Sequence, residues 1–196
     1  MQLFSTEGLK TLDSASDNSI YLRINKLEAN KAHKLRVLDG IWAWRIFVLP
    51  EGESKQRPIR SATKPDFIPP NATEGFNGDK PKWQLTLALM VWDYAAEAFK
   101  VLEIHQTTIL ESIKELQTDE NWGDVREYDL SFKRLEKDGK VSYKVTPLPK
   151  TKVPKAMAEA LANTPYRMEN LYDGGHPFGD DAEFPEDTEE EALDAA

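Results

Sequence analysis

Cationic and aromatic side chains occur together over residues 55–94 of this 196-residue chain. Such a mixture suits an unpaired nucleic-acid strand, because cations neutralise phosphates while flat rings stack on bases for about 1–3 kcal/mol per base. Basic loops also serve simply for solubility, so the stretch is a candidate and not a signature. The cationic candidates within it are Arg57, Arg60, Lys64, Lys80 and Lys82.

The aromatic candidates for base stacking are Trp44, Phe67, Trp83, Trp92 and Tyr94. Alternate residues of a strand face opposite sides, so sequence parity separates core positions from surface positions. Trp83 shares its parity with the leucines that follow it, which fits a core position and a surface position equally well. Trp92 has the opposite parity, so we expect its ring to be exposed.

Two further groups of candidates follow from the same parity argument. Trp42 and Trp44 share a parity with the apolar residues at 46 and 48, so at least one of them is expected in the core. Arg45 lies opposite them and is expected at the surface. Lys133 and Lys144 face outward on a predicted hairpin, where ordinary solvation is the commoner role but an extension of the cationic groove is also open.

Alternating apolar and polar residues predict the strands that must carry these side chains. The longest run is interrupted by Asp39-Gly40, where a glycine indicates a bulge or a sharp bend, so one bent strand or a hairpin would fit. The expected strands run over residues 20–24, 33–48, 83–92, 99–104, 127–135 and 141–146.

Helix and turn signals separate these strands. The apolar spacing becomes helical over residues 108–117, where Thr108 and Glu111 would form a capping box. Asp138-Gly139 predicts a two-residue hairpin turn. Residues 50–82 hold six prolines and three glycines, so they predict a long loop with a short strand at 58–62. A short helix is expected over 155–162, after Pro154.

Three strands, a helix and a two-stranded hairpin follow one another in the order of the oligonucleotide/oligosaccharide-binding (OB) fold. We therefore expect a mainly β protein: a five-stranded OB barrel with one helix between strands three and four and a long first loop. The expected organisation is a flexible segment at 1–18, a single-stranded-DNA-binding OB domain at 19–149, a linker with a short helix at 150–172, and a disordered acidic tail at 173–196.

The net charge of −9 is concentrated in the tail. From Asp173 onward there are ten acidic residues and no Lys or Arg, which leaves 24 acidic and 25 basic residues in 1–172. A tethered polyanion can occupy a DNA-binding groove at high effective concentration and also recruit partners; a solubility tail is the alternative. The tail residues expected to act in this way are Phe178, Asp180, Asp181, Glu183, Phe184, Glu186, Asp187, Glu189, Glu190, Glu191 and Asp194.

Catalytic chemistry finds little support in the sequence. The absence of cysteine excludes disulfides and thiolate zinc sites. Asp119, Glu120 and Asp124 are more typical of turns than of a metal site, and no nucleophile–base set is evident. We expect no enzyme activity, catalytic residue, metal or cofactor. The N-terminus has no apolar stretch that predicts a signal peptide and no segment predicts a membrane span, so a cytoplasmic protein is expected.

Eight short segments, taken in order, resemble bacteriophage single-stranded DNA-binding proteins of the OB class over residues 20–150. The segments are YLRI (21–24), HKLRVL (33–38), RPIR (57–60), VWDY (91–94), VLEI (101–104), NWGD (121–124), YDL (128–130) and YKVTP (143–147). The resemblance implies coating of single-stranded DNA during phage replication, recombination and repair in the host cytoplasm. It also implies replication or recombination partners for the tail, and it admits a homo-oligomer.

The tail departs from the common bacterial form of such proteins, because it ends in Leu193-Asp194-Ala195-Ala196 without a terminal aromatic residue. Two other functions stay open at this point. One is a non-catalytic module whose acidic tail mimics DNA and inhibits a host protein. The other is a metal-dependent nuclease, which would require cleavage of DNA with magnesium or manganese.

Overall fold

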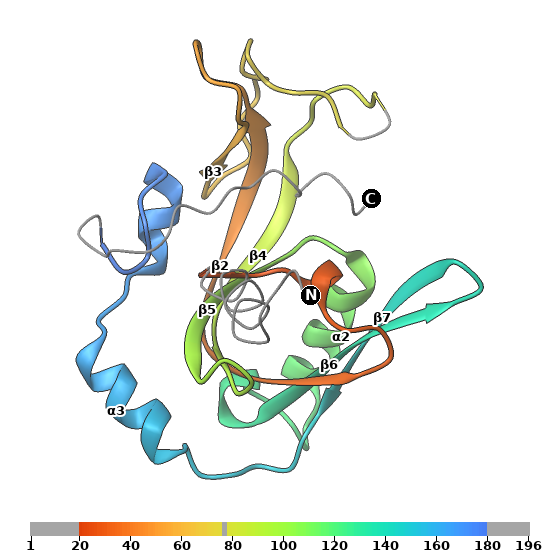
Figure 1. Cartoon of the computed structure of the whole chain (residues 1–196), viewed down its shortest axis with the longest axis vertical. Helices are drawn as coiled ribbons and strands as arrows, with labels where there is room; N and C mark the ends of the chain where they lie inside the picture. Colours follow the sequence, from red (N-terminus) through yellow and green to blue (C-terminus); the bar gives the residue numbers. More distant parts are fainter. Residues whose placement is uncertain (1–19, 76–77, 180–196) are drawn as a thin grey trace, which may run out of the picture.

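The computed structural model describes residues 20–75 and 78–179. Within these ranges the protein is mainly β, with one mixed seven-stranded sheet and two α-helices (Figure 1). The strands are β1 (Tyr21–Leu22), β2 (Ala32–Val48), β3 (Arg57–Ser61), β4 (Gln84–Asp93), β5 (Ala98–Ile104), β6 (Asp129–Lys137) and β7 (Lys140–Pro147). The helices are α2 (Thr107–Thr118) and α3 (Lys155–Asn163), and short 3-10 turns occur at η1 (Ile24–Lys26), η2 (Val125–Glu127) and η3 (Met168–Asp173).

The predicted order of strands and helix is confirmed, but the closed five-stranded barrel is not. The sheet has the order β1-β5-β4-β2-β6-β7, with β3 paired to β2. β1 runs parallel to β5 and takes the edge of β5 that a closing strand would need. In the part of the chain that the structure describes, no ladder joins β7 to β1 or β5, so the sheet stays open.

The first long strand is one bent strand, as one of the two sequence interpretations had it. Its register with β4 shifts between Val37 and Asp39, and this irregularity reverses the parity of the residues that face the core. Gly40 lies directly opposite Leu89. A Cβ at Gly40 would be 2.6 Å from Leu89 Cδ2, so any larger residue at this position would have to displace the Leu89 side chain.

The local signals for turns were more reliable than those for helix caps. Asp138 and Gly139 have φ angles of 53° and 72°, as a two-residue hairpin turn of type I′ requires, and the predicted turn is confirmed. The predicted capping box of α2 is wrong. The N-cap lies two residues earlier, at Gln106, and makes no side-chain capping bond.

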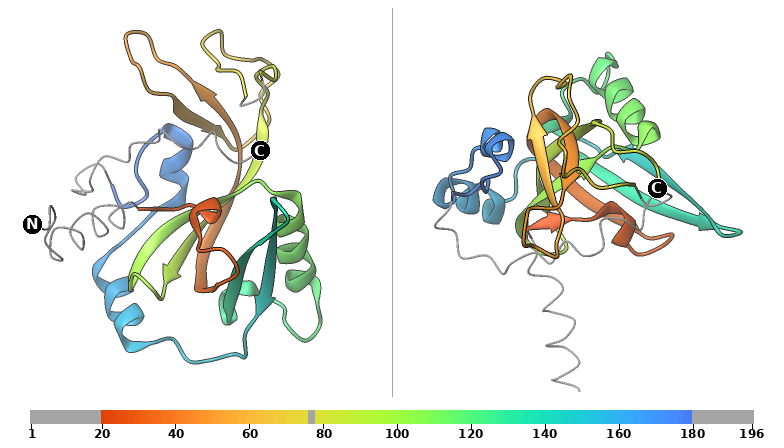
Figure 2. Two further views of the ribbon diagram at one scale, coloured as in Figure 1. Left: turned by 45° about the vertical axis from the view of Figure 1, so that its right-hand side comes forward. Right: turned by 90° about the horizontal axis from the view of Figure 1, so that it is seen from above.

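The lower part of the sheet is covered on both faces (Figure 2). On the inner face, α2 packs Ile109 and Ile113 against strand residues that include Leu89 and Leu102. On the outer face, η3 and the residues around it cover Ala88, Met90 and Val101. No helix in the described ranges is long and apolar enough to cross a membrane.

The upper part of the sheet extends beyond α2 as an arm (Figure 1). We define the arm as residues 42–48 of β2, strand β3 and residues 84–87 of β4, which are joined by their ladders. It has a small core of its own, in which Ile46, Val48 and Trp83 are buried. The arm therefore presents part of its inner face without a covering helix.

Candidate nucleic-acid interface

Two indole rings lie on the inner face of the arm. Trp42 is 49% exposed and Trp44 is half-buried, and both face the same side because they alternate along β2. The ammonium of Lys64 lies 5.1 Å from the centroid of the Trp44 ring. On β4, the exposed Leu85 pairs with Trp44. We call these four residues the tryptophan platform: it combines flat apolar surface with a cation, as base stacking beside a phosphate requires.

Trp42 is a candidate that parity alone did not single out. Its parity matches the buried residues at 46 and 48. The expectation that at least one of Trp42 and Trp44 lies in the core is met in part, because Trp44 is half-buried against the core of the arm, whereas Trp42 is exposed. Trp42 is exposed because α2 reaches only the base of the arm, so the inner face above it has no helical cover. A signal was present in the sequence, because two tryptophans at alternate positions are a large apolar surface for one strand to bury.

Trp83 is a core residue that fixes the loop beside the platform. Its ring is 8% exposed, and its Nε1 donates a hydrogen bond of 2.7 Å to the carbonyl oxygen of Phe67. The backbone of Phe67 is therefore anchored while its side chain remains 67% exposed. Trp83 thus positions a candidate stacking residue and is itself withdrawn from contact with a ligand.

Arg45 and Arg60 lie on the opposite face of the arm, where they bind a carboxylate of β5. Arg45 Nη1 is 2.6 Å from Glu103 Oε2, and Arg60 Nε is 2.6 Å from Glu103 Oε1. All three side chains are largely buried. Burial by itself would raise the pKa of Glu103, but the guanidinium groups of Arg60 and Arg45 hold that pKa below its ordinary value. These two arginines fasten the arm to β5.

The other cationic candidates are solvent-exposed apart from the half-buried Lys133, and the structure spreads them widely. Arg57 forms a surface ion pair with Glu53, with 2.9 Å between Nε and Oε2. Lys80 and Lys82 are exposed on the segment that leads into β4. Lys133 and Lys144 pair with each other across β6 and β7, on the sheet face opposite to α2. The structure therefore brings Lys64 to the platform and leaves Lys133 and Lys144 remote from it.

The expected exposure of Trp92 is wrong, although its parity was read correctly. Its side chain does lie on the face opposite to the leucines, but only 4% of its surface is exposed. Trp92 packs edge-on against Phe99, with 5.1 Å between ring centroids, and Phe99 in turn contacts Tyr166 and Phe178. Residues more than 70 positions further along the chain cover this face, and strand parity carries no information about such a cover.

Tyr94 is held in a buried polar network and not on an open surface. Its hydroxyl donates to Asp129 Oδ1 over 2.8 Å, and Lys34 Nζ lies 4.1 Å from its ring centroid. Burial and the hydrogen bond to Asp129 raise the pKa of Tyr94 to about 12. Asp129 also accepts from Arg36 and Thr151, so the network ties β2, β6 and the start of the C-terminal segment together.

The tail candidates are divided between packed and undescribed residues. Phe178 packs against Phe99 and Tyr166, with 6.4 Å between ring centroids in each case. It is therefore part of the cover over the outer face. The other tail candidates lie outside the described residues: Asp180, Asp181, Glu183, Phe184, Glu186, Asp187, Glu189, Glu190, Glu191 and Asp194.

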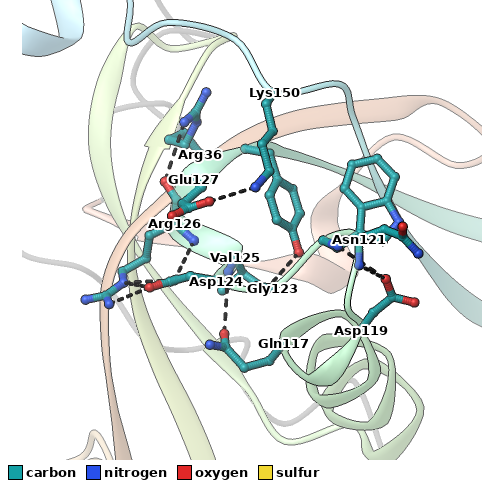
Figure 3. A network of polar contacts seen from close by, with 12 residues as sticks. Arg36, Gln117, Asp119, Asn121, Gly123, Asp124, Val125, Arg126, Glu127 and Lys150 are labelled. Atoms are coloured by element: carbon teal, nitrogen blue, oxygen red, sulfur yellow. Dashed lines mark hydrogen bonds and ion pairs between the residues drawn. The ribbon is translucent and has the colours of Figure 1, made fainter.

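Two of the three acidic residues after α2, Asp119 and Asp124, have the turn roles that the sequence suggested (Figure 3). Asp119 Oδ1 accepts from the backbone N–H groups of Asn121 and Trp122, and Asp124 accepts from the backbone N–H of Arg126. Over residues 20–75 and 78–179, no three His, Asp or Glu side chains gather in a group that could hold a metal ion.

The geometry thus brings together Trp42, Trp44, Lys64 and Leu85, and it removes Trp83, Trp92, Arg45 and Arg60 into packed or paired positions. Comparisons with known proteins found no relative of this chain. No protein-family model matches the chain, and neither does any curated protein or solved structure.

Proposed function

We propose that this protein binds and coats single-stranded DNA without sequence preference, and that the tryptophan platform is its base-stacking surface. The observation that carries the proposal is the pair Trp42 and Trp44, which share one strand face: Trp42 is exposed, and the ammonium of Lys64 lies over the half-buried Trp44 ring. Every base has a flat face, so stacking on such rings is tolerant of sequence. Bases in a duplex are already stacked on each other and cannot use the platform.

The surroundings of the platform support the same proposal. The exposed Phe67 is held by its backbone to Trp83, and Lys80 and Lys82 are exposed on the same connection between β3 and β4. Cations of this kind bind phosphates in any sequence. The strand order β5-β4-β2-β6-β7, with α2 between β5 and β6, also supports an OB-like fold, here with an open sheet.

The proposal also includes a role in phage DNA replication, recombination or repair. In this role the acidic tail modulates DNA binding and recruits partners. This part is drawn from the sequence resemblance over residues 20–150 and from the charge of the tail. An enzyme activity is not part of it.

The test compares the affinity of the full chain for labelled oligo(dT) with its affinity for a duplex of equal length. Both affinities are measured by fluorescence anisotropy at several salt concentrations. We expect tighter binding to the single strand, with a slope of about 0.7 log units per log salt for each phosphate neutralised. Trp42→Ala should weaken binding, while Leu161→Ala, which removes an exposed apolar side chain on α3, should not. Equal or tighter binding to duplex would contradict the proposal.

A further inference from the structure

A pocket of about 340 Å³ opens beside Trp42, where the arm meets α2. This volume lies at the lower end of the range of about 300–1,000 Å³ that is typical of small-molecule sites. Its walls come from β2, β4, α2 and the turn at η2. The apolar part of the lining consists of Val37, Trp42, Leu87, Leu89, Leu110, Ile113 and Val125.

Gly40 and Trp42 line the pocket from β2. After the register shift at residues 37–39, the inner face of β2 continues through Gly40 to Trp42. An ideal Cβ at Gly40 would lie 2.6 Å from Leu89 Cδ2, so a larger residue at this position would have to displace the Leu89 side chain, which also lines the pocket.

The rim of the pocket is polar, ordered and balanced in charge. Gln117 Oε1 accepts a hydrogen bond of 3.4 Å from the Val125 backbone N–H (Figure 3). The Arg126 guanidinium donates hydrogen bonds of 2.6–3.0 Å to both carboxylate oxygens of Asp124. Two acidic residues, Asp39 and Asp124, and two basic residues, Lys114 and Arg126, line the site. Apolar walls and a neutral hydrogen-bonding rim suit a flat, uncharged heterocycle better than an ion.

We infer that this pocket holds one unstacked nucleobase of the strand that crosses the tryptophan platform. Trp42 belongs to both surfaces, so a strand on the platform brings a base to the mouth of the pocket. The apolar walls receive the faces of the base, and the rim offers donors and acceptors to its polar edge. The inference rests on the proposed function, and it adds to the platform a point where the strand is anchored.

Lys114 is the position at which to close the pocket. It lines the pocket from an exposed position on α2, so Lys114→Trp fills the mouth without disturbing the core. Lys114→Ala removes the same charge without filling the space. Glu111→Trp places the same ring on the same helix at an exposed position outside the pocket lining. Thr118→Trp is a second filling variant at the rim.

The measurement is the dissociation constant of each full-length variant for oligo(dT) and for an oligonucleotide of the same length in which every nucleotide is abasic. Lys114→Trp and Thr118→Trp should weaken oligo(dT) binding by about fivefold to tenfold, consistent with the loss of one base contact. Lys114→Ala, which removes one donor from the rim, should weaken it less than the filling variants do, and Glu111→Trp, outside the pocket lining, should change it less than twofold. None of the four should alter binding to the abasic strand, and thermal melts should show all four folded.

Different results would overturn different statements. If the wild-type chain bound no single strand, the proposed function itself would fall. If the wild-type chain and Trp42→Ala behaved as proposed but both filling variants bound like Glu111→Trp, only the base pocket would be refuted. Tighter binding on filling the pocket would also refute it, because the pocket would then hold a competing segment of the chain or another apolar ligand.

Discussion

The two faces of the sheet carry similar aromatic residues and use them differently. Trp42 and Trp44 lie on the inner face, where α2 reaches only the base of the arm. Trp92 and Phe99 stand on the outer face, where Tyr166 and Phe178 close over them. An aromatic residue on a strand is therefore available to a ligand only where no later segment covers its face, and in this protein only the inner face of the arm meets that condition among the four rings.

The largest expected effect is on the covered face. Trp92→Ala should lower the free energy of unfolding by about 3–5 kcal/mol, because it removes a fully packed ring and leaves a cavity against Phe99. The DNA affinity of the fraction that stays folded should be unchanged. Denaturant unfolding and oligo(dT) titration below the midpoint measure the two quantities. A loss of affinity with unchanged stability would mean that the outer face binds the strand.

The ion pairs of Arg45 and Arg60 with Glu103, which we call the clamp, should have the next largest effect on stability. Glu103→Gln removes the charge between Arg45 and Arg60 and should cost about 1.5–3 kcal/mol of stability, as expected for hydrogen bonds to charged groups. The exposed pair Arg57 and Glu53 provides a control, since Glu53→Gln should cost less than about 1 kcal/mol. Similar losses for both variants would show that burial adds nothing to the clamp.

The same clamp predicts a dependence of stability on pH. The pKa of Glu103 is lowered in the folded protein, so its contribution is fully present above its ordinary value of 4.5 and is lost as the pH falls through the lowered folded value. Wild type should therefore lose stability below about pH 4.5 more steeply than Glu103→Gln. Urea midpoints between pH 3 and 7 provide the comparison, and parallel curves for the two proteins would contradict it.

On the inner face of the arm, in contrast to Trp92→Ala, we expect a loss of DNA affinity with little change in stability. Trp42→Ala should weaken oligo(dT) binding by about 1–3 kcal/mol, the range for one stacking ring, and change stability by no more than about 0.5 kcal/mol, as for other exposed positions. The slope of affinity against salt should not change, because no phosphate contact is lost. A destabilisation as large as that of Trp92→Ala would place Trp42 in the core of the arm.

The smallest expected effect is that of the acidic residues that follow Phe178 in the chain. Deletion of residues 180–196 removes nine acidic charges and brings the formal net charge from −9 to zero, while leaving Phe178 in its place on Phe99. If the tail competes for the platform, the truncated chain should bind oligo(dT) more tightly by roughly a few-fold at low salt, where screening is weakest. Equal affinities of the two chains at low salt would limit the tail to solubility or partner binding.

Sequence patterns predicted those features that depend on neighbouring residues. The bend near Gly40, the Asp138-Gly139 turn and the order of strands and helix all follow from local spacing and backbone preference. The N-cap of α2 was misplaced by two residues because Thr108 and Glu111 matched a capping pattern that the helix does not use.

Features that depend on distant segments could not be read from the same patterns. The cover over Trp92 comes from residues around 166–178, and the partners of Arg45 and Arg60 come from a glutamate at least 43 positions away. The exposure of Trp42 depends on where α2 ends relative to the arm. Parity assigns a residue to a face, and only the assembled fold decides whether that face is open.

The account is tested most directly by ultraviolet cross-linking of the full chain to oligo(dT) in which 5-iododeoxyuridine replaces single thymidines, followed by mass spectrometry of the cross-linked peptide. Iodouracil reacts with aromatic rings in close contact with the base. We predict cross-links at Trp42 or Trp44, which are lost with Trp42→Ala and Trp44→Ala combined. Cross-links concentrated at the rings of the covered face, or none at the platform despite saturating binding, would contradict the assignment of the tryptophan platform as the DNA-binding surface.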